Sequence, residues 1–244
     1  RWQADRLVRE LGCVVLIADL LSDLEGWVWA DRNRYANERT SLLEYGPHET
    51  NGLMGRWKLQ GAINSALDAV RNIQQVDEGR IAALGWCFGG QTILELSRMN
   101  CTGVVGVASY HGVFDGILQQ PSSVPNIDTN PTPIADVKQA QDDIRIESDA
   151  NGDHRKQNHP RALICNGNAD PYVKPDDFQA ALDTFEQSTF ALDVLTFEGT
   201  RHGFTNPYQD INLDENFAYS EEAATQSWDS TMELLHDVFR DEYD

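Results

Sequence analysis

Hydrophobic residues recur along the chain with two alternating spacings. Over residues 2–11 the apolar positions follow the i, i+3, i+4, i+7 spacing of an amphipathic helix, and Gly12 is a typical C-terminal stop. The next six residues, CVVLIA at 13–18, form a short continuous apolar run rich in β-branched side chains. Runs of this kind are buried on both faces of a parallel sheet. The pattern therefore predicts a helix over 2–11 that leads directly into a strand over 13–18.

The same two patterns alternate through the rest of the chain. Apolar runs predict further strands at 80–85, 103–109, 162–167 and 191–197. Helical spacing predicts further helices around 59–70, 93–96, 178–185 and 224–239. The polar and aromatic stretch before the second helix is interpreted as a long loop. Strands that alternate with helices of this length predict the α/β class, with a mostly parallel sheet covered by helices on both faces.

One segment, residues 115–160, breaks this alternation. It contains PSSVPNIDTNPTP and ESDANGDHRKQNHP, which are rich in Pro, Asn, Asp and Ser and are typical of loops, with a short helix near 134–144. A chain of 244 residues is long enough to bury one substantial core. We therefore expect a single domain over residues 1–244 with a loop-rich insertion at about 115–160.

Composition and charge narrow the set of partners. The chain has 39 acidic and 19 basic residues, a formal net charge of -20, which disfavours binding to nucleic acid and to anionic membranes. No apolar run approaches the roughly 18 to 20 residues that a membrane helix needs. Four cysteines are too few and too irregularly spaced for a disulfide framework. We expect reduced thiols and a cytoplasmic protein that binds neither membranes nor nucleic acid.

A cysteine occupies the centre of the glycine-framed stretch GWCFGG, residues 85–90, between a predicted strand and a predicted helix. This is the context of the G-x-nucleophile-x-G elbow, in which flanking glycines avoid clashes in a strained turn. A bare match of this length more often marks a buried structural cysteine. The elbow, however, also predicts an acid and then a histidine after later strands, and Asp170 and His202 stand there. Each alone could be a turn residue. Their order predicts a triad of Cys87, Asp170 and His202.

These stretches resemble the dienelactone hydrolases, a branch of the α/β-hydrolase fold that uses a cysteine nucleophile. The resemblance covers nearly the whole chain, through ADRLVRELGCVVLIADLL, GWCFGG, ASYHGVF, NGNADPYV, TRHGF and AATQSWDSTMELL. It implies that Cys87, Asp170 and His202 are catalytic. It also implies an enzyme that hydrolyses small lactones or carboxylic esters through a thioacyl-enzyme intermediate, without a cofactor or a metal.

The implied chemistry assigns a role to each residue. Thiolate is the nucleophilic form, and a nearby histidine and a helix N-terminus favour its formation at Cys87. His202 would assist deprotonation and later protonate the leaving oxygen, while Asp170 holds the imidazole in the correct tautomer. The backbone N–H of Phe88 would donate to the developing oxyanion, and water would then release the acid.

The sequence departs from the family pattern at two places. The family has an arginine four positions after the catalytic histidine that helps to hold the substrate carboxylate, and Asn206 stands there in this chain. That difference argues against dienelactone itself as the substrate. If residues 2–11 are the first helix of the fold, the loop that supplies a second oxyanion donor and a glutamate partner of the cysteine would lie upstream of Arg1. We therefore expect a chain that lacks the N-terminal strands and is at most weakly active by itself.

Several further residues are candidates for contact with the substrate. Trp86, Tyr110, His111 and Asn206 are expected near the carboxyl ends of the strands, where this fold binds ligands. Packing is an equally good explanation for Tyr110 and His111. Three aromatic residues of the long loop would either cap an apolar substrate or anchor the loop, and anchoring is favoured; they are Trp27, Trp29 and Tyr35.

Two alternatives compete with these assignments. His154 and His159 lie five residues apart in a polar loop near Asp149 and Asp153, but the spacing does not match a calcium loop, and a solvated loop is the better interpretation. The rival to the enzyme is a non-catalytic protein that keeps the fold and uses Cys87 as a redox-sensing thiol. Asp170 and His202 favour the enzyme, because a redox sensor needs no general base oriented by a carboxylate.

Overall fold

The computed structural model describes residues 2–21, 32–44, 49–50, 53–54, 56–115 and 160–240. They belong to one compact unit, which comprises residues 1–118 and 159–244. A second unit, residues 119–158, lies outside the described residues. The predicted insertion at 115–160, with its short helix, falls almost wholly on that second unit and stays a prediction.

The centre of the fold is a parallel four-stranded sheet with the strand order β3-β4-β5-β6. Its strands are β3 (Ile81–Trp86), β4 (Val104–Tyr110), β5 (Arg161–Gly167) and β6 (Ala191–Phe197). They confirm the four strands that the apolar runs predicted after residue 80. Trp86 pairs with Tyr110, and Tyr110 with Cys165, so the carboxyl ends of three successive strands lie side by side.

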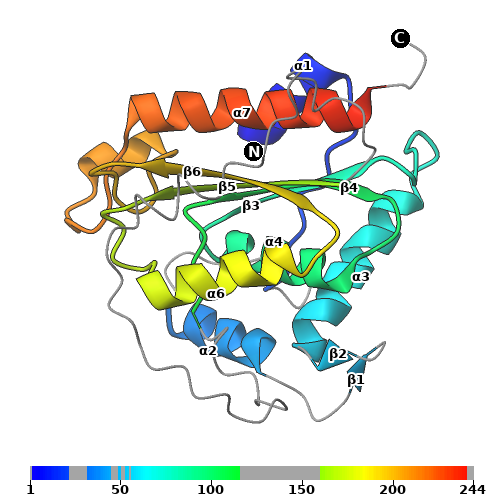
Figure 1. Ribbon diagram of the computed structural model, residues 1–244, viewed down its shortest axis with the longest axis horizontal. Coiled ribbons are helices and arrows are strands. Elements are labelled where there is room, and N and C mark those ends of the chain that lie inside the picture. Colours follow the sequence, from blue (N-terminus) through cyan, green and yellow to red (C-terminus); the bar gives the residue numbers. More distant parts are fainter. Residues whose placement is uncertain are drawn as a thin grey trace, which may run out of the picture. The chain divides into compact units, whose positions relative to one another are not determined.

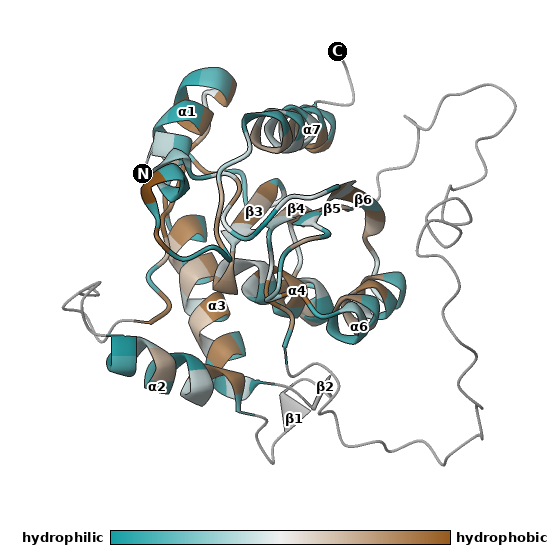
Figure 2. Ribbon diagram, turned by 90° about the vertical axis from the view of Figure 1, so that its left-hand side faces the viewer, coloured by the Kyte–Doolittle hydropathy of each residue, from teal (hydrophilic) through white to brown (hydrophobic). Residues whose placement is uncertain are grey.

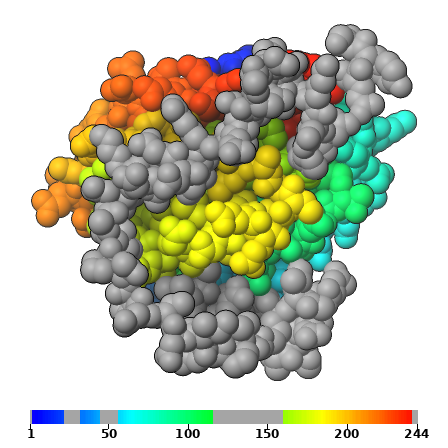
Figure 3. Space-filling view, in the orientation of Figure 1, coloured from blue at the N-terminus to red at the C-terminus, as the bar shows by residue number. Residues whose placement is uncertain are grey.

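Helices cover both faces of this sheet. In Figures 1 and 2, α1 and α7 lie on one side of the sheet, and α3, α4 and α6 lie on the other. Helices α6 (yellow) and α7 (orange to red) reach the surface on the face shown in Figure 3. The bounds are α1 (Trp2–Leu11), α2 (Arg32–Leu43), α3 (Trp57–Arg71), α4 (Phe88–Met99), α6 (Pro175–Glu186) and α7 (Glu221–Phe239). All five helices that the sequence predicted are present.

Each face of the sheet packs against its own hydrophobic cluster. On the α1 and α7 side the buried residues include Tyr110, Cys165 and Trp228. On the other side they include Leu59 and Ile164. Burial on both faces follows from the continuous apolar runs of the central strands, and burial of this kind is the main favourable contribution to folding.

The predicted strand at 13–18 is wrong. The structure has no regular element there, and within the described residues no strand pairs with this segment. Cys13 and Val15 still pack against the cluster beneath α1 and α7. Val14, Leu16 and Ile17 are exposed. Side chains alternate inward and outward over residues 13–16, as in a strand, but a strand forms only where a neighbouring strand accepts its backbone hydrogen bonds.

The interpretation of residues 22–55 as one long loop is wrong in part. This stretch contains α2 and a short antiparallel hairpin of β1 (Glu49–Thr50) and β2 (Leu53–Met54). Helix α2 buries none of its residues and has no apolar stripe for a pattern search to detect. In the part of the chain that the structure describes, no helix is both long enough and apolar enough to cross a membrane.

Candidate active site

Cys87 occupies a sharp turn between β3 and α4. Its backbone has φ 56° and ψ -115°, a conformation that L-residues rarely adopt. A Cβ on Gly85 would lie 2.1 Å from the carbonyl oxygen of Gly89, and a Cβ on Gly90 would lie 2.4 Å from Oγ of Ser109. A Cβ on Gly89 would meet nothing within 4 Å. The structure therefore requires glycine at position 85, as expected. On the other side of Cys87 it requires glycine at position 90 and not at position 89.

Backbone hydrogen bonds hold Cys87 in this conformation from three directions. Its N–H donates to the carbonyl oxygen of Tyr110 at the end of β4, at 3.0 Å. Its own carbonyl oxygen accepts from Gly90 at 2.9 Å and from Val113 at 3.2 Å. A strained residue persists only where its surroundings determine it in this way, and such residues concentrate at functional sites.

Phe88, the proposed oxyanion donor, is the first residue of α4. The first N–H groups of a helix have no acceptor within it; that of Gly90 bonds Cys87, and that of Phe88 would face an anion beside Cys87. The Arg39 guanidinium lies over the Phe88 ring, 5.5 Å from its centroid. Arg39 also forms an ion pair with Asp115 and donates to Oε1 of Gln91 at 3.4 Å. These contacts hold α2 against the start of α4.

Asp170 follows β5 and is buried, with one carboxylate oxygen for each of two donors. Oδ1 accepts from the backbone N–H of Tyr172 at 2.9 Å, and Oδ2 bonds Nδ1 of His202 at 2.7 Å. The loops after β5 and β6 are in close contact, because a Cβ on Gly167 would lie only 2.0 Å from the carbonyl oxygen of Thr200. This close approach brings two residues that are 32 positions apart into a buried hydrogen bond.

His202 lies between Asp170 and Cys87. Its side chain is only 3% exposed. Burial disfavours the charged imidazolium, but hydrogen bonds with Asp170 and with Cys87 outweigh this effect and raise the pKa of His202 to about 9. Because Nδ1 bonds Asp170, the other ring nitrogen is the one left for Cys87. The three residues that the sequence predicted are therefore brought together, in the order nucleophile, imidazole, carboxylate.

Three aromatic rings surround the His202 imidazole edge-on. Their centroids lie 4.9 Å (His111), 4.9 Å (Tyr172) and 5.2 Å (Phe217) from that of His202. Sequence reasoning did not find Tyr172 or Phe217. The position of Tyr172, two residues after Asp170, was an available signal, whereas Phe217 lies in a polar stretch that gives none. The rings keep water away from the imidazole, which strengthens its hydrogen bonds.

The contacts of three expected substrate-binding residues favour a structural role. Trp86 and Tyr110 stack with ring centroids 4.8 Å apart and planes 2° apart, and the Tyr110 hydroxyl donates to Oγ1 of Thr231 in α7 at 2.5 Å. Asn206 uses its side-chain oxygen to accept from the N–H of Tyr208 at 3.1 Å, which caps the 3-10 helix η2 (Pro207–Ile211).

Tyr35 is half-buried on α2. Burial raises the pKa of its phenol, and the nearby Cys87 and Asp115 add to this rise while Arg39 opposes it. Trp27 and Trp29, predicted with it, lie outside the described residues.

The two histidines of the metal alternative belong to the predicted insertion. His154 and His159 lie outside the described residues. Among the residues that are described, no three His, Cys, Asp or Glu side chains cluster as metal ligands.

A model of the dienelactone hydrolase family matches residues 3–239 of this chain. The chain belongs to the dienelactone hydrolase family. Among solved structures, a dienelactone hydrolase-like promiscuous phosphotriesterase from metagenomic libraries is 25% identical, with 98% of this chain and 80% of that chain covered and a TM-score of 0.67. The structure of m3DLH is 21% identical, with 88% and 72% covered and a TM-score of 0.61.

A curated relative extends the comparison to an animal. An uncharacterised protein of Caenorhabditis elegans is 24% identical over 187 residues, which are 75% of this chain and 95% of that protein. The matched family and structures confirm the α/β-hydrolase fold that the resemblance to the dienelactone hydrolases implied. They also show that the protein belongs to a family of hydrolases.

Proposed function

We propose that this protein hydrolyses small lactones or carboxylic esters, with Cys87 as nucleophile, His202 as acid and base, and Asp170 as the group that orients His202. The observation that carries the proposal is the buried 2.7 Å hydrogen bond between Asp170 and Nδ1 of His202. It leaves the other ring nitrogen of His202 for the strained Cys87. A small-molecule substrate agrees with the hydrolase family to which the chain belongs.

The raised pKa of His202 fits a cysteine partner, because the hydrogen bond with Cys87 is one of its causes. With a pKa of about 9, His202 is an imidazolium at neutral pH. A serine nucleophile would need a neutral imidazole to remove its proton. A cysteine does not, because it attacks as a thiolate, and a thiolate paired with an imidazolium is the reactive form of such a site.

Acylation follows from this pair. The Cys87 thiolate attacks the carbonyl carbon, a C–S bond forms, and the carbonyl electron pair moves to the oxygen, where the N–H of Phe88 stabilises the charge. The electron pair then returns and the C–O bond to the leaving group breaks. The His202 imidazolium gives its proton to the departing oxygen, and a thioacyl-enzyme remains.

Deacylation uses His202 in the opposite direction. The imidazole, now neutral, takes a proton from water as the water oxygen attacks the thioester carbon. The C–S bond breaks, the acid leaves, and the thiolate and imidazolium are restored. Asp170 keeps the same tautomer of His202 throughout, because its hydrogen bond fixes the proton on Nδ1.

Phosphotriesters are a second substrate class to assay. The relative that covers 98% of this chain is described as a promiscuous phosphotriesterase. A phosphotriester, like a carboxylic ester, offers a neutral electrophilic centre with an oxygen leaving group. The absence of an arginine at Asn206 agrees with a neutral substrate.

The test is release of p-nitrophenol from p-nitrophenyl acetate. Cys87→Ala should reduce kcat/KM by at least about 10³-fold, because the attacking atom is removed. Cys101→Ala is the matched control, because it removes another half-buried thiol, at the amino end of the sheet, and should leave activity unchanged.

Three results would contradict the proposal in different ways. Near wild-type activity of Cys87→Ala would exclude Cys87 as nucleophile. Full activity of Cys87→Ser would indicate an ordinary serine esterase. An inactive wild-type protein whose Cys87 oxidises readily with peroxide would favour the redox-sensing alternative.

A further inference from the structure

The turn that follows β4 is built around a second strained residue. His111 has φ 38°, in the left-handed region that side chains other than glycine rarely adopt. Its N–H donates to the carbonyl oxygen of Cys165 at 2.7 Å, and the next N–H, of Gly112, donates to Oδ1 of Asn166 at 3.1 Å. The N–H of Val113 then bonds the carbonyl oxygen of Cys87. The strained turn is therefore attached directly to the backbone of the proposed nucleophile.

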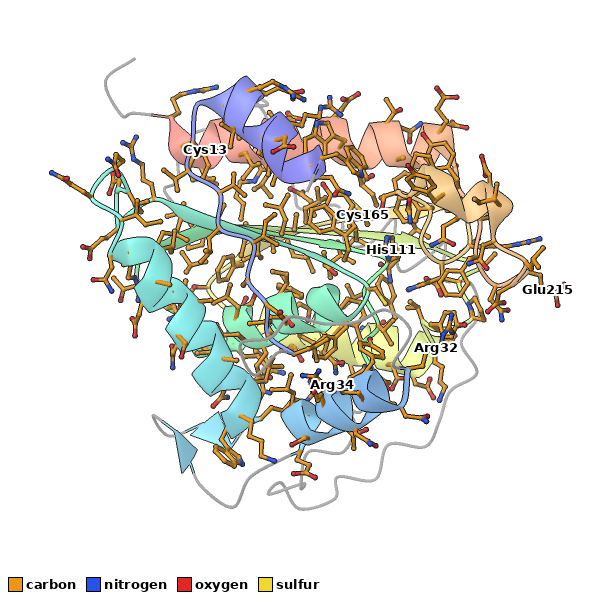
Figure 4. All side chains as sticks on the ribbon, turned by 180° about the vertical axis from the view of Figure 1, so that it is seen from behind. Cys13, Arg32, Arg34, His111, Cys165 and Glu215 are labelled. Carbon is orange, nitrogen blue, oxygen red and sulfur yellow. The ribbon has the colours of Figure 1, made fainter. Side chains whose placement is uncertain are left out.

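The His111 side chain connects this turn to a different loop. Its Nε2 forms a 3.1 Å hydrogen bond with Oγ1 of Thr205, which stands three residues after His202. Its ring packs edge-on against His202, at 4.9 Å, and against Phe204, at 5.3 Å. Figure 4 labels His111 at the end of the sheet nearest the loop that carries Glu215. One side chain thus links the loop of His202 to the turn that bonds Cys87.

The remaining polar atom of the ring adds no second anchor. Nδ1 of His111 is buried and has no hydrogen-bond partner among the described residues. The residue is 5% exposed. The orientation of the imidazole depends on Thr205 and on the two rings against which it packs.

We propose that His111 is a positioning residue, whose hydrogen bond to Thr205 fixes the His202 loop at the distance from Cys87 that the thiolate and imidazolium pair requires. This proposal rests on the proposed function of Cys87 and His202. A ring of similar size without nitrogen would fill the same space but would not hold Thr205, and loss of a productive geometry by about 1 Å can cost on the order of 10²-fold in rate.

His111 does not compete with His202 for the proton. Burial, and after it the neighbouring His202, lower the pKa of His111 to about 3. It is therefore neutral wherever the enzyme works. A neutral ring can hold His202 in place without the repulsion that a second imidazolium would bring, and it cannot serve as a second acid or base near pH 7.

The first experiment removes the hydrogen bond by changing Thr205, because the backbone of His111 is strained and that of Thr205 is not. Thr205→Val keeps the branched shape and deletes the hydroxyl, and we expect kcat on p-nitrophenyl acetate to fall about tenfold, with KM changed less than twofold. Thr200→Val is the control, because Thr200 is equally buried in the same loop and its hydroxyl does not reach His111. It should retain wild-type kcat.

A second readout distinguishes positioning from general loosening. The rate at which iodoacetamide alkylates Cys87 at pH 7, without substrate, reports the thiolate fraction that His202 supports. We expect Thr205→Val to slow alkylation at least threefold and Thr200→Val to leave it unchanged. Wild-type alkylation and kcat in Thr205→Val would overturn the proposal. The proposed function would stand in that case, provided that Cys87→Ala is inactive.

A double-mutant cycle completes the test. His111→Phe keeps a ring beside His202 and loses the hydrogen bond, so it should reduce kcat to about the same extent as Thr205→Val, about tenfold. If both act through one hydrogen bond, the double variant should also lose about tenfold and not about a hundredfold. Multiplicative losses would show that the two residues act independently and would overturn the proposal. If His111→Phe does not fold, the kcat and alkylation rates of Thr205→Val and Thr200→Val decide the question.

Discussion

Two glycines of the elbow motif should respond to the same substitution in opposite ways. Gly85 and Gly89 flank Cys87 symmetrically in the sequence, but only Gly85 faces an obstacle. An added Cβ at Gly85 would lie 2.1 Å from the carbonyl oxygen of Gly89, 2.3 Å from its carbon and 2.7 Å from Cγ1 of Ile93. Non-bonded carbon atoms normally approach to about 3.5 to 4.0 Å. Gly85→Ala therefore requires the backbone of the elbow to move by more than about 1 Å.

The expected loss of stability in Gly85→Ala depends on which atoms obstruct the added Cβ. Overpacking a core usually costs about 1 to 3 kcal/mol when side chains can rearrange. Here the obstacle is backbone that also holds the strained Cys87, so we expect a loss of about 3 kcal/mol or more from the free energy of unfolding. For a chain of this size that corresponds to a fall in Tm of about 6 to 12 °C. Gly89→Ala places a better helix former in α4, with nothing within 4 Å, and should gain about 0.5 to 1 kcal/mol.

The measurement is thermal unfolding of the wild type and both variants, followed by circular dichroism at one protein concentration. Activity is not the readout, because a methyl group at position 89 would lie beside the proposed oxyanion donor. If Gly85→Ala unfolded at the wild-type temperature, the close approach of β3 and α4 would be wrong. An equal fall in unfolding temperature in both variants would show that the loss of stability comes from replacing any glycine of the motif and not from the contact at Gly85.

Three further predictions concern the triad and its support. His202→Gln should reduce kcat/KM on p-nitrophenyl acetate more than Asp170→Asn, because Asp170 orients the imidazole and transfers no proton; a harmless Asp170→Asn would mean that another carboxylate orients it. Because folding raises the pKa of His202 from about 6.5 to about 9, its contribution to stability is complete below about pH 6.5 and is lost as the pH rises through 9. Urea unfolding should show a decline of up to about 3 kcal/mol over that range in the wild type, and its persistence in His202→Gln would assign it to other groups. Tyr110→Phe should cost about 1 to 2 kcal/mol in the same assay, because Thr231 loses its buried donor, and should leave KM unchanged; a raised KM would restore Tyr110 as a substrate contact.

The local pattern of apolar residues was sufficient to predict most of the helices and strands. The apolar runs predicted β3 to β6, and helical spacing predicted α1, α3, α4, α6 and α7, because periodic burial leaves its period in the sequence. The order of Cys87, Asp170 and His202 after successive strands was also readable, since the carboxyl ends of parallel strands share one edge of a sheet. Helix α2 was missed because it buries none of its residues, and the predicted strand at 13–18 was wrong because strand formation depends on a neighbour and not on the run itself.

The sequence by itself therefore determined the α/β class, the alternation of helices and strands from α3 to α7, and the three residues of the proposed triad. Only the tertiary structure decided that Gly90 rather than Gly89 needs to be glycine, that Tyr172 and Phe217 enclose His202, and that His111 reaches Thr205. The reason is physical. Periodicity reports which side of an element is buried, whereas these contacts join residues on separate loops, and their distances follow from the register of β3, β4 and β5 and from the turns at their ends.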